Sequence, residues 1–252
     1  MYMKNSNLLA KISSFGIFYR WHPEVALRYL PFVAEIGKWK KIKILEVGSG
    51  GLGITPYLGR EVIGIDKEFY PPFHPFLKRV KASALKLPFK NSSFDLVLSS
   101  DMLEHLRKKD RERAISEMLR VARTKVFIGL PCGKDAYQQD VFLDNYFRQH
   151  LEKKYHFLDQ QVTYGLPEKK EIYDTIQKAA RNNRKKVKII VKGNENLALR
   201  LFLMKGWISN NFITNIIFRK IFLFAIPIFR LINQKPNYRQ LFFVSIQNED
   251  SY

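Results

Sequence analysis

Short apolar runs, separated by polar stretches with a helical pattern, fill the first half of the chain. Each run is rich in aliphatic and β-branched residues and ends near glycine, proline or a polar residue, which is typical of strands buried on both faces of a sheet. Five such runs are expected to contain strands, at residues 41–47, 61–66, 80–89, 94–100 and 125–130, and the third of them is expected to be a weak strand followed by a turn. Strands that alternate with helices or turns at this density predict an α/β fold with a doubly wound, mostly parallel sheet.

Apolar residues three or four positions apart indicate the helices. The helix before the first strand is expected to be interrupted near Pro31, because proline lacks the N–H that a helix needs. The segments with a helical pattern are 23–38, 137–154 and 168–181, whereas 101–122 is expected to be a loop and a helix. Residues 57–60 are expected to lie on the helix that follows the glycine turn.

Two strand-like runs in the second half, 186–192 and 241–247, enclose a long apolar and basic insertion. No internal repeat and no flexible linker divides the chain, so we predict a single domain over 1–252. Its expected parts are a cofactor-binding half at 40–135 and a substrate-side half at 136–252, which includes a helical insertion at 194–236.

The turn after the first strand reads ILEVGSGGLG at 44–53 and contains a GxGxxG pattern led by an acid. Glycines in such a turn let the backbone approach a ligand and present its N–H groups in front of a helix. Glu46 would repel the pyrophosphate of a dinucleotide but would attract an ammonium or sulfonium cation. Asp66 ends the next strand, where a carboxylate accepts hydrogen bonds from ribose hydroxyls. By itself, the pattern also suits a glycine turn that only packs a helix against the sheet.

Three further segments follow in a characteristic order: LPF at 87–89, FDLV at 94–97 and LEH at 103–105. Together with the acid-led turn they resemble the class I S-adenosylmethionine-dependent methyltransferases, in particular the type 11-like group. The resemblance implies a Rossmann-like fold with seven strands, in which the two late strands form an antiparallel pair at one end. It also implies S-adenosyl-L-methionine as the cofactor.

The resemblance assigns the cofactor contacts residue by residue. The end of the first strand and the glycine turn are expected to line the methionine part, and Asp66 to hold the ribose. Ser83 stands where many relatives carry an aspartate that meets the adenine amino group, so adenine recognition is expected to depend on backbone and on Leu85. The residues expected to bind the cofactor are Glu46, Gly48, Ser49, Gly50, Asp66, Ser83, Ala84, Leu85 and Ser100.

Asp101 and His105 are the titratable residues beside the expected position of the methyl group. Methyl transfer needs positioning, and a general base only when the acceptor is a hydroxyl or an amine. Histidine has a suitable pKa for that base, but either residue also suits a structural role at a helix start. Arg28 and Tyr29 lie on the first helix, which in relatives can close over the cofactor; packing on the sheet rim suits them equally. The other histidines lack metal-ligand spacing, so we predict no metal.

The chain carries a formal net charge of +20, and no Asp or Glu stands between Glu195 and Glu249. This charge favours a polyanionic partner, although surface lysines without a specific role would give the same total. Apolar residues interrupted by cations and by Pro227 suit a segment at 213–233 that lies in the headgroup region of an anionic membrane. A helical cap buried over the active site suits the pattern equally well. Nucleic acid is the less favoured partner, because the basic runs lack interleaved stacking aromatics.

Cys132 is the one cysteine, which excludes an internal disulfide and agrees with a reducing compartment. No apolar run reaches the roughly 18 residues of a spanning helix. We therefore predict a cytoplasmic protein, peripheral on the inner membrane face if the basic tail binds lipid. Its predicted function is S-adenosylmethionine-dependent methyl transfer to a small or lipid-linked acceptor. An RNA-modifying methyltransferase and a non-catalytic binding module on the same fold are the alternatives.

Overall fold

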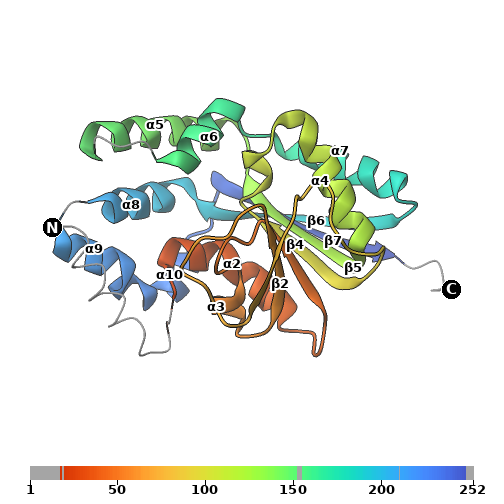
Figure 1. Ribbon diagram of the computed structural model, residues 1–252. Helices are drawn as coiled ribbons and strands as arrows, with labels where there is room; N and C mark the ends of the chain where they lie inside the picture. Colours follow the sequence, from red (N-terminus) through yellow and green to blue (C-terminus); the bar gives the residue numbers. More distant parts are fainter. Residues whose placement is uncertain (1–17, 19, 152–154, 210, 248–252) are drawn as a thin grey trace.

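A computed structural model describes residues 18, 20–151, 155–209 and 211–247 (Figure 1). Seven strands form one sheet in the order β3-β2-β1-β4-β5-β7-β6. β7 is antiparallel to both of its neighbours and the other pairs are parallel. The strands are β1 (Ile44–Val47), β2 (Val62–Asp66), β3 (Leu77–Lys81), β4 (Phe94–Ser100), β5 (Ala122–Pro131), β6 (Lys186–Asn196) and β7 (Asn237–Gln247). This confirms the predicted fold class, including the terminal antiparallel pair.

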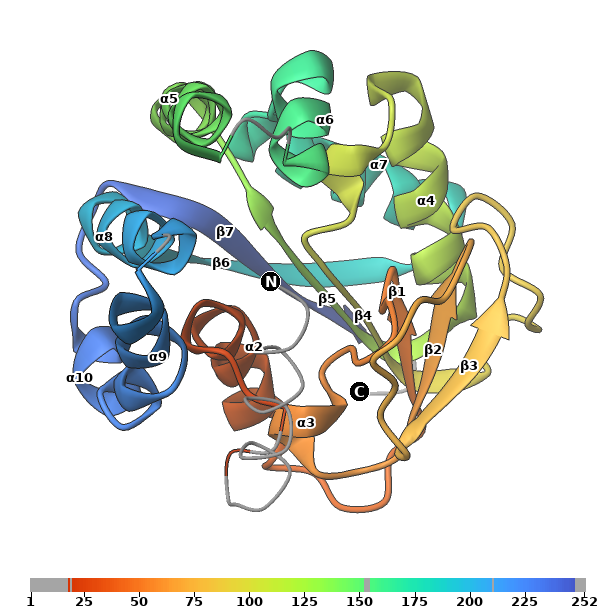
Figure 2. The ribbon, with the colours of Figure 1, turned by 60° about the vertical axis from the view of Figure 1, so that its left-hand side comes forward.

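Helices cover both faces of the sheet (Figure 2). On one face, α4 (Lys108–Val121) and α7 (Lys169–Asn182) bury an apolar core against β1, β4, β5 and β7. On the other face, α2 (Pro23–Ile36) packs beside the short α3 (Thr55–Leu58) and parts of the late insertion. The two predicted halves therefore share one sheet, because β7 pairs with β5 and β6 pairs with β7.

Further helical segments lie at the carboxyl end of the sheet. The 3₁₀ turn η1 (Leu103–His105) follows β4, and α5 (Lys134–Leu151) follows β5. α6 (His156–Tyr164) packs against both η1 and α5. No helix was predicted at the position of α6. These segments place side chains above the strand ends at which a ligand of an open α/β sheet binds.

The insertion between β6 and β7 has two different parts. Its first helix, α8 (Leu197–Ile208), buries Leu199 and Leu203 and contacts α2 and α5. The second part, α9 (Phe212–Arg219), η2 (Ile221–Leu223) and α10 (Ile226–Leu231), carries many exposed apolar side chains. No helix in the described part of the chain is long and apolar enough to cross a membrane. A buried cap and a membrane-surface segment were the alternatives for this insertion; α8 is the buried part and α9, η2 and α10 form the exposed part.

The third strand and the helix after the glycine turn differ from their predictions. The third strand, β3, begins at Leu77, before the predicted segment 80–89, and ends at Lys81, the second residue of that segment. The helix after the glycine turn is only four residues long, because Gly59 ends it in the left-handed conformation with φ 65°. Arg60 was expected on that helix; it instead donates hydrogen bonds to the carbonyl oxygens of Ile36 and Trp39 at the end of α2, at 3.2 and 2.9 Å.

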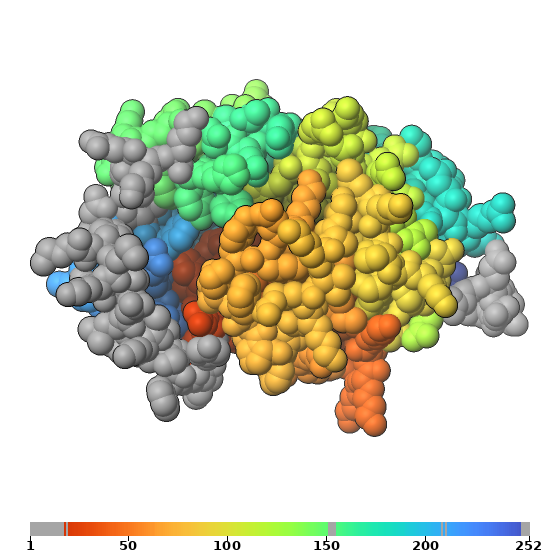
Figure 3. All heavy atoms as spheres, in the orientation of Figure 1, coloured from red at the N-terminus to blue at the C-terminus, as the bar shows by residue number. Residues whose placement is uncertain are grey.

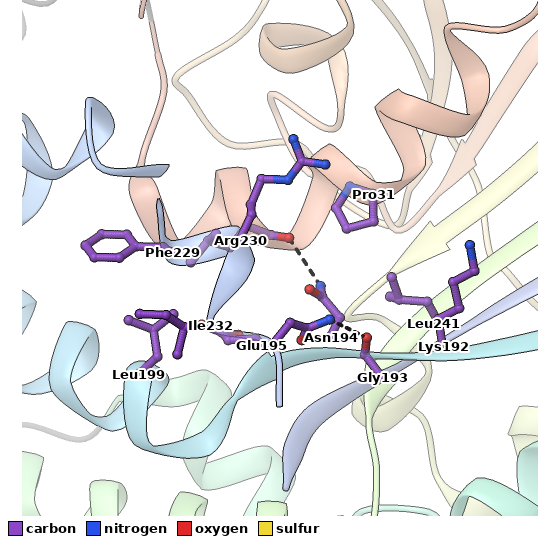
Figure 4. Close-up of a pocket in the computed structure, with 12 residues that line it drawn as sticks. Pro31, Lys192, Gly193, Asn194, Glu195, Leu199, Phe229, Arg230, Ile232 and Leu241 are labelled. Atoms are coloured by element: carbon purple, nitrogen blue, oxygen red, sulfur yellow. Dashed lines mark hydrogen bonds between the residues drawn. The ribbon is translucent and has the colours of Figure 1, made fainter. Parts of the chain in front are cut away.

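The predicted interruption of α2 at Pro31 is also wrong, because the helix is continuous. Pro31 cannot donate to the carbonyl oxygen of Leu27, one turn earlier. The side-chain amide of Asn194, from the end of β6, donates to that oxygen instead, at 3.2 Å (Figure 4). Asn194 lies in the wall of a small cavity of about 200 Å³ between α2, β6 and α10. A residue 167 positions away along the chain therefore replaces the missing helix donor.

Replacing Asn194 by alanine should lower the free energy of unfolding by about 1–2 kcal/mol, because a buried carbonyl oxygen loses its donor. Urea denaturation measures this loss. In a Pro31→Ala background the helix supplies its own N–H to Leu27, so the same Asn194→Ala change should then cost clearly less. Equal losses in the two backgrounds would show that Asn194 does not act through this carbonyl.

Candidate functional site

Backbone hydrogen bonds join the glycine turn, which follows β1, to the end of β2. Gly48, Gly50 and Gly53 have positive φ angles of 80°, 55° and 53°, which other residues rarely adopt. The N–H groups of Gly48 and Ser49 donate to the carbonyl oxygen of Ile65 at 2.8 and 3.1 Å. The turn is therefore bent back over the end of β2, beside Asp66.

Close approach to neighbouring chain segments explains two of the glycines. A Cβ atom on Gly48 would collide with the side chain of Met102, and one on Gly51 would collide with the carbonyl oxygens of Tyr70 and Pro72. A Cβ atom on Gly50 would meet nothing within 4 Å. The turn is thus packed on both sides and open above Gly50.

Glu46 is fully buried beneath the turn. One carboxylate oxygen accepts a hydrogen bond from the Tyr29 hydroxyl at 2.7 Å, and the other accepts one from the Ile54 N–H at 2.8 Å. Burial raises the pKa of Glu46 to about 7, although both hydrogen bonds favour the ionised form. The acid thus joins α2 to the start of α3, and Tyr29 acts as its partner.

Asp66 and Ser83 lie at the ends of the next two strands. The Asp66 carboxylate accepts hydrogen bonds from the N–H groups of Gly50, at 2.9 Å, and Lys67, at 2.7 Å. The Ser83 hydroxyl accepts one from the Leu85 N–H at 3.2 Å, which closes a tight turn. Asp66 is therefore beside the open side of the glycine turn, as a ribose-binding acid must be. Cofactor contacts of Ser83, Ala84 and Leu85 stay a prediction.

A cavity of about 740 Å³ opens next to the turn, above the carboxyl ends of β1 and β4. In Figure 3 the orange loop 67–76, which contributes Tyr70 and Pro72 to its wall, lies beneath the green helices α5 and α6. Of the predicted site residues, Ser49, Asp101 and His105 line this cavity, and its far wall comes from α2, α6 and α8. The structure therefore brings the glycine turn and both predicted catalytic residues to one cavity.

A buried charge network holds Asp101. The Nε of Arg239 lies 2.8 Å from both carboxylate oxygens of Asp101, and the same guanidinium binds Glu24, at 2.6 Å, and Glu195. Arg28 approaches Asp101 less closely, at 3.3 Å. Burial alone would raise the pKa of Asp101, but Arg239 and Arg28 outweigh it and lower that pKa to about 2. Asp101 is therefore a weak base, suited to positioning.

His105 has a different environment. Burial lowers its pKa, so that the imidazole is neutral near pH 7. Its Nε2 lies 3.8 Å from the Glu104 carboxylate, and its ring contacts Phe157 with a centroid distance of 5.5 Å. Its Nδ1 has no hydrogen-bond partner among the described residues. A neutral ring that lines the cavity is able to accept a proton, so a base role remains a prediction for His105.

The sequence prediction missed the buried role of two basic residues in the acid-free tail. Arg200, on α8, is 3% exposed and binds Asp140 at 2.8 Å, and Arg239, on β7, is 2% exposed. Both guanidiniums also lie over the ring of Tyr238, with centroid distances of 3.4 and 5.0 Å. Because their partners are distant in the sequence, no local pattern distinguishes these two arginines from surface ones. Within the described residues, no cluster of His, Cys, Asp and Glu could hold a metal ion.

The comparisons with known proteins agree with this geometry. Residues 45–128 match the protein family described as "Methyltransferase domain". A search of curated proteins finds no match. Three solved structures illustrate the similarity in fold. A chain from the complex that contains the Haloferax volcanii Trm112 methyltransferase activator has a TM-score of 0.52 and 11% identity, covering 88% of this chain and 89% of that one.

Phosphoethanolamine N-methyltransferase 2 of Haemonchus contortus, in complex with S-adenosyl-L-methionine, has a TM-score of 0.52 and 16% identity, covering 88% of this chain and 52% of that one. The [4+2]-cyclase SpnF has a TM-score of 0.52 and 13% identity, covering 89% and 81%. At these identities the similarity in structure establishes the fold alone. Residues 45–128 thus match a methyltransferase domain, and the seven-stranded sheet around them has the Rossmann-like methyltransferase fold.

Proposed function

We propose that this protein binds S-adenosyl-L-methionine and transfers its methyl group to a small or lipid-linked acceptor. The observation that carries the proposal is one continuous cavity, which extends from the glycine turn past Asp101 and His105 to α6 and α8. A cofactor bound at the turn and an acceptor bound under α8 would meet inside it. The Haemonchus structure supports the choice of cofactor, because that protein holds S-adenosyl-L-methionine on the same fold.

The residues at the turn fit this cofactor. The space above Gly50 is open, and the Asp66 carboxylate beside it is suited to ribose hydroxyls. Glu46 supplies negative potential beneath the turn, where a cation is favoured. When bound, the cofactor supplies a methyl group that its sulfonium charge activates for displacement.

The chain's own residues would then position the acceptor and take up its proton. Asp101 has a positive φ angle of 49° and is held by Arg239, which gives the end of β4 a fixed geometry. The neutral His105 ring would accept a proton from a hydroxyl or amine acceptor. Tyr155 and Phe157 on the α6 side would exclude water from the reacting atoms.

Calorimetry tests the cofactor. Titration with S-adenosyl-L-methionine should show one binding site, and titration with NAD should show none, since the buried Glu46 beneath the turn would repel a pyrophosphate bound above it. Binding of NAD without binding of S-adenosyl-L-methionine would contradict the proposal. Strong RNA binding that falls steeply with salt would favour the RNA-modifying alternative. Absence of cofactor binding would favour the non-catalytic one.

The lipid-linked part of the proposal depends on the exposed face of α9, η2 and α10. Arg230 on α10 and Lys235 after it are exposed beside this face, and the sequence holds no acid from 196 to 248. Apolar side chains flanked by cations suit an anionic membrane surface. The most exposed apolar residues of the face, each at least half exposed, are Phe212, Ile213, Ile221, Phe224, Ile228 and Leu231.

In a flotation assay, the protein should rise with vesicles that contain phosphatidylglycerol at low salt and stay behind with neutral ones. Replacing Phe224 and Leu231 together by glutamate should remove most of this binding, since the two side chains are 72% and 80% exposed. Ile190→Glu is the matched control, because Ile190 is 49% exposed on β6, outside this face. Wild-type protein that never floats with anionic vesicles would exclude a membrane role for this face.

A further inference from the structure

The buried polar atoms without a partner around the large cavity share one property: they are nitrogens. Both ring nitrogens of His22, the Nε atoms of Arg28 and Arg200, the Nδ1 of His105 and the Nε1 of Trp207 are buried and have no hydrogen-bond partner among the described residues. All five residues line the cavity. The buried side-chain oxygens that lack partners in the described part of the chain belong to residues outside its wall.

Buried donors require acceptors, and an unpaired one costs about 1–3 kcal/mol. Arginine and tryptophan side chains can only donate, and each neutral histidine ring donates through one nitrogen. Burial lowers the pKa of His22 to about 4, so its ring is neutral in the free protein. The cavity wall thus offers an excess of donors, which a ligand rich in acceptor oxygens would satisfy.

The charges of the wall point in the same direction. Among the described residues that line the cavity are five arginines and two carboxylates, Glu24 and Asp101. Both carboxylates are bound by Arg239, and Arg200 is neutralised by Asp140 behind the wall. Arg239 also binds Glu195 behind the wall, and the wall itself carries more guanidinium donors than carboxylate acceptors.

Arg28 is the cation best placed to bind a ligand. Among the described residues it forms an ion pair with Asp101, at 3.3 Å, and Arg239 already contacts both oxygens of that carboxylate at 2.6–2.8 Å. The Arg28 guanidinium also lies over the ring of Tyr29, at 4.7 Å from the centroid, and its side chain is 21% exposed. Its Nε is a donor that no described neighbour uses.

The rest of the cavity suits an apolar or aromatic body. Tyr57, Tyr155, Phe157, Met204 and Trp207 line it, and the ring of Trp207 packs against that of Tyr155 with a centroid distance of 5.6 Å. Flat aromatic walls bind flat or apolar groups through dispersion and stacking. An anion attached to such a body would meet both properties of the cavity.

We propose that the acceptor is an organic anion, with a carboxylate or phosphate on an aromatic or apolar body, and that Arg28 holds its negative charge. The inference deepens the proposed function, on which it rests, by naming the class of acceptor. The apolar wall orients the body of the acceptor, and the ion pair with Arg28 fixes its direction relative to His105 and the end of β4.

Matched probes test the charge requirement. Benzoate and phenyl phosphate carry the anion, whereas benzamide has the shape of benzoate without its charge. Each probe is titrated calorimetrically into the protein with and without S-adenosylhomocysteine. The anions should bind at least about ten-fold more tightly than benzamide. Benzoate alone or phenyl phosphate alone showing this preference would identify the carboxylate or the phosphate as the recognised group.

Variants of Arg28 test whether this residue causes the preference for anions over benzamide. Arg28→Gln should reduce anion affinity to that of benzamide, and Arg28→Lys should keep part of the preference because it keeps the charge. Arg230→Gln, on the exposed surface of α10, should change nothing. Thermal unfolding of each variant shows whether it is folded. If Arg28→Gln is not folded, the comparison of Arg28→Lys with the wild-type protein decides the test.

The outcomes separate this inference from the proposed function. If wild-type protein binds the anions but neither S-adenosylmethionine nor S-adenosylhomocysteine, the transferase proposal fails and the anion site stands. Equal binding of benzamide and the anions, or no binding of any probe, overturns the inference. It is also overturned if Arg28→Gln weakens S-adenosylhomocysteine binding and leaves probe binding unchanged, because Arg28 would then hold the cofactor's own carboxylate.

Discussion

Replacing Arg239 by glutamine should lower the free energy of unfolding by about 3–5 kcal/mol, the usual cost of removing one partner of a buried ion pair. The guanidinium contacts Asp101, Glu24 and Glu195, and its side chain is only 3% exposed. Without it, three carboxylates would share a buried site, with Arg28 as the remaining close cation. Urea denaturation followed by circular dichroism measures the loss.

Two controls show whether charge is the cause. Arg230→Gln on the exposed surface should change stability by no more than about 0.5 kcal/mol. Adding Glu195→Gln to the Arg239→Gln variant removes one of the uncompensated carboxylates, so part of the lost stability should return. A loss below about 1 kcal/mol for Arg239→Gln would mean that the network does not hold these acids together.

Replacing Glu46 by glutamine should weaken binding of S-adenosyl-L-methionine by about ten-fold or more and leave S-adenosylhomocysteine binding nearly unchanged. The two ligands differ by the methyl group and the sulfonium charge, so the difference between them isolates the electrostatic effect of the carboxylate. Glutamine keeps an oxygen that accepts a hydrogen bond, whereas its amide removes the charge. Calorimetry with both ligands measures the two affinities.

The preference for the charged ligand should also depend on pH. Burial raises the pKa of Glu46 to about 7, so the carboxylate of the free protein takes up a proton as the pH falls through 7. The wild-type preference should therefore decrease from pH 8 to pH 6, and Glu46→Gln should show a preference that does not change over this range. Equal weakening of both ligands would assign Glu46 a purely structural role.

Tyr29→Phe separates the two roles of Glu46. It removes the 2.7 Å hydrogen bond from the Tyr29 hydroxyl and keeps the carboxylate. We expect lower stability, by about 1 kcal/mol, with the preference for S-adenosyl-L-methionine retained. A preference lost in this variant as fully as in Glu46→Gln would show that the bond to Tyr29, and not the charge, controls the cofactor.

Local sequence patterns were sufficient to predict those features whose physical cause lies in neighbouring residues. β4 was predicted with its observed bounds, because an apolar run between polar residues describes a strand buried on both faces. The glycine turn and Asp66 were also identified, because positive φ angles and a carboxylate at a strand end leave direct signs in the sequence. The length of α3 was not predicted, because Gly59 was not recognised as its end.

Interactions between distant segments were not predictable in the same way. Asn194 replaces the donor that Pro31 lacks, and nothing near either residue in the sequence indicates the other. Arg200 and Arg239 carry the same charge as their exposed neighbours, and burial beside Asp140 and Asp101 is what distinguishes them. The role of a charged side chain therefore depends on the partners that lie next to it in the folded protein.

By itself, the sequence determined the α/β class, the order of most strands and helices, and the acid-led turn at the end of β1, because each depends on residues close together in the chain. Only the tertiary structure decided that Glu46 lies beneath the turn with Tyr29, that Arg239 neutralises Asp101, and that Arg28 faces the large cavity. These depend on α2, β1, β4 and β7 meeting at one end of the sheet, a consequence of packing that no local pattern contains.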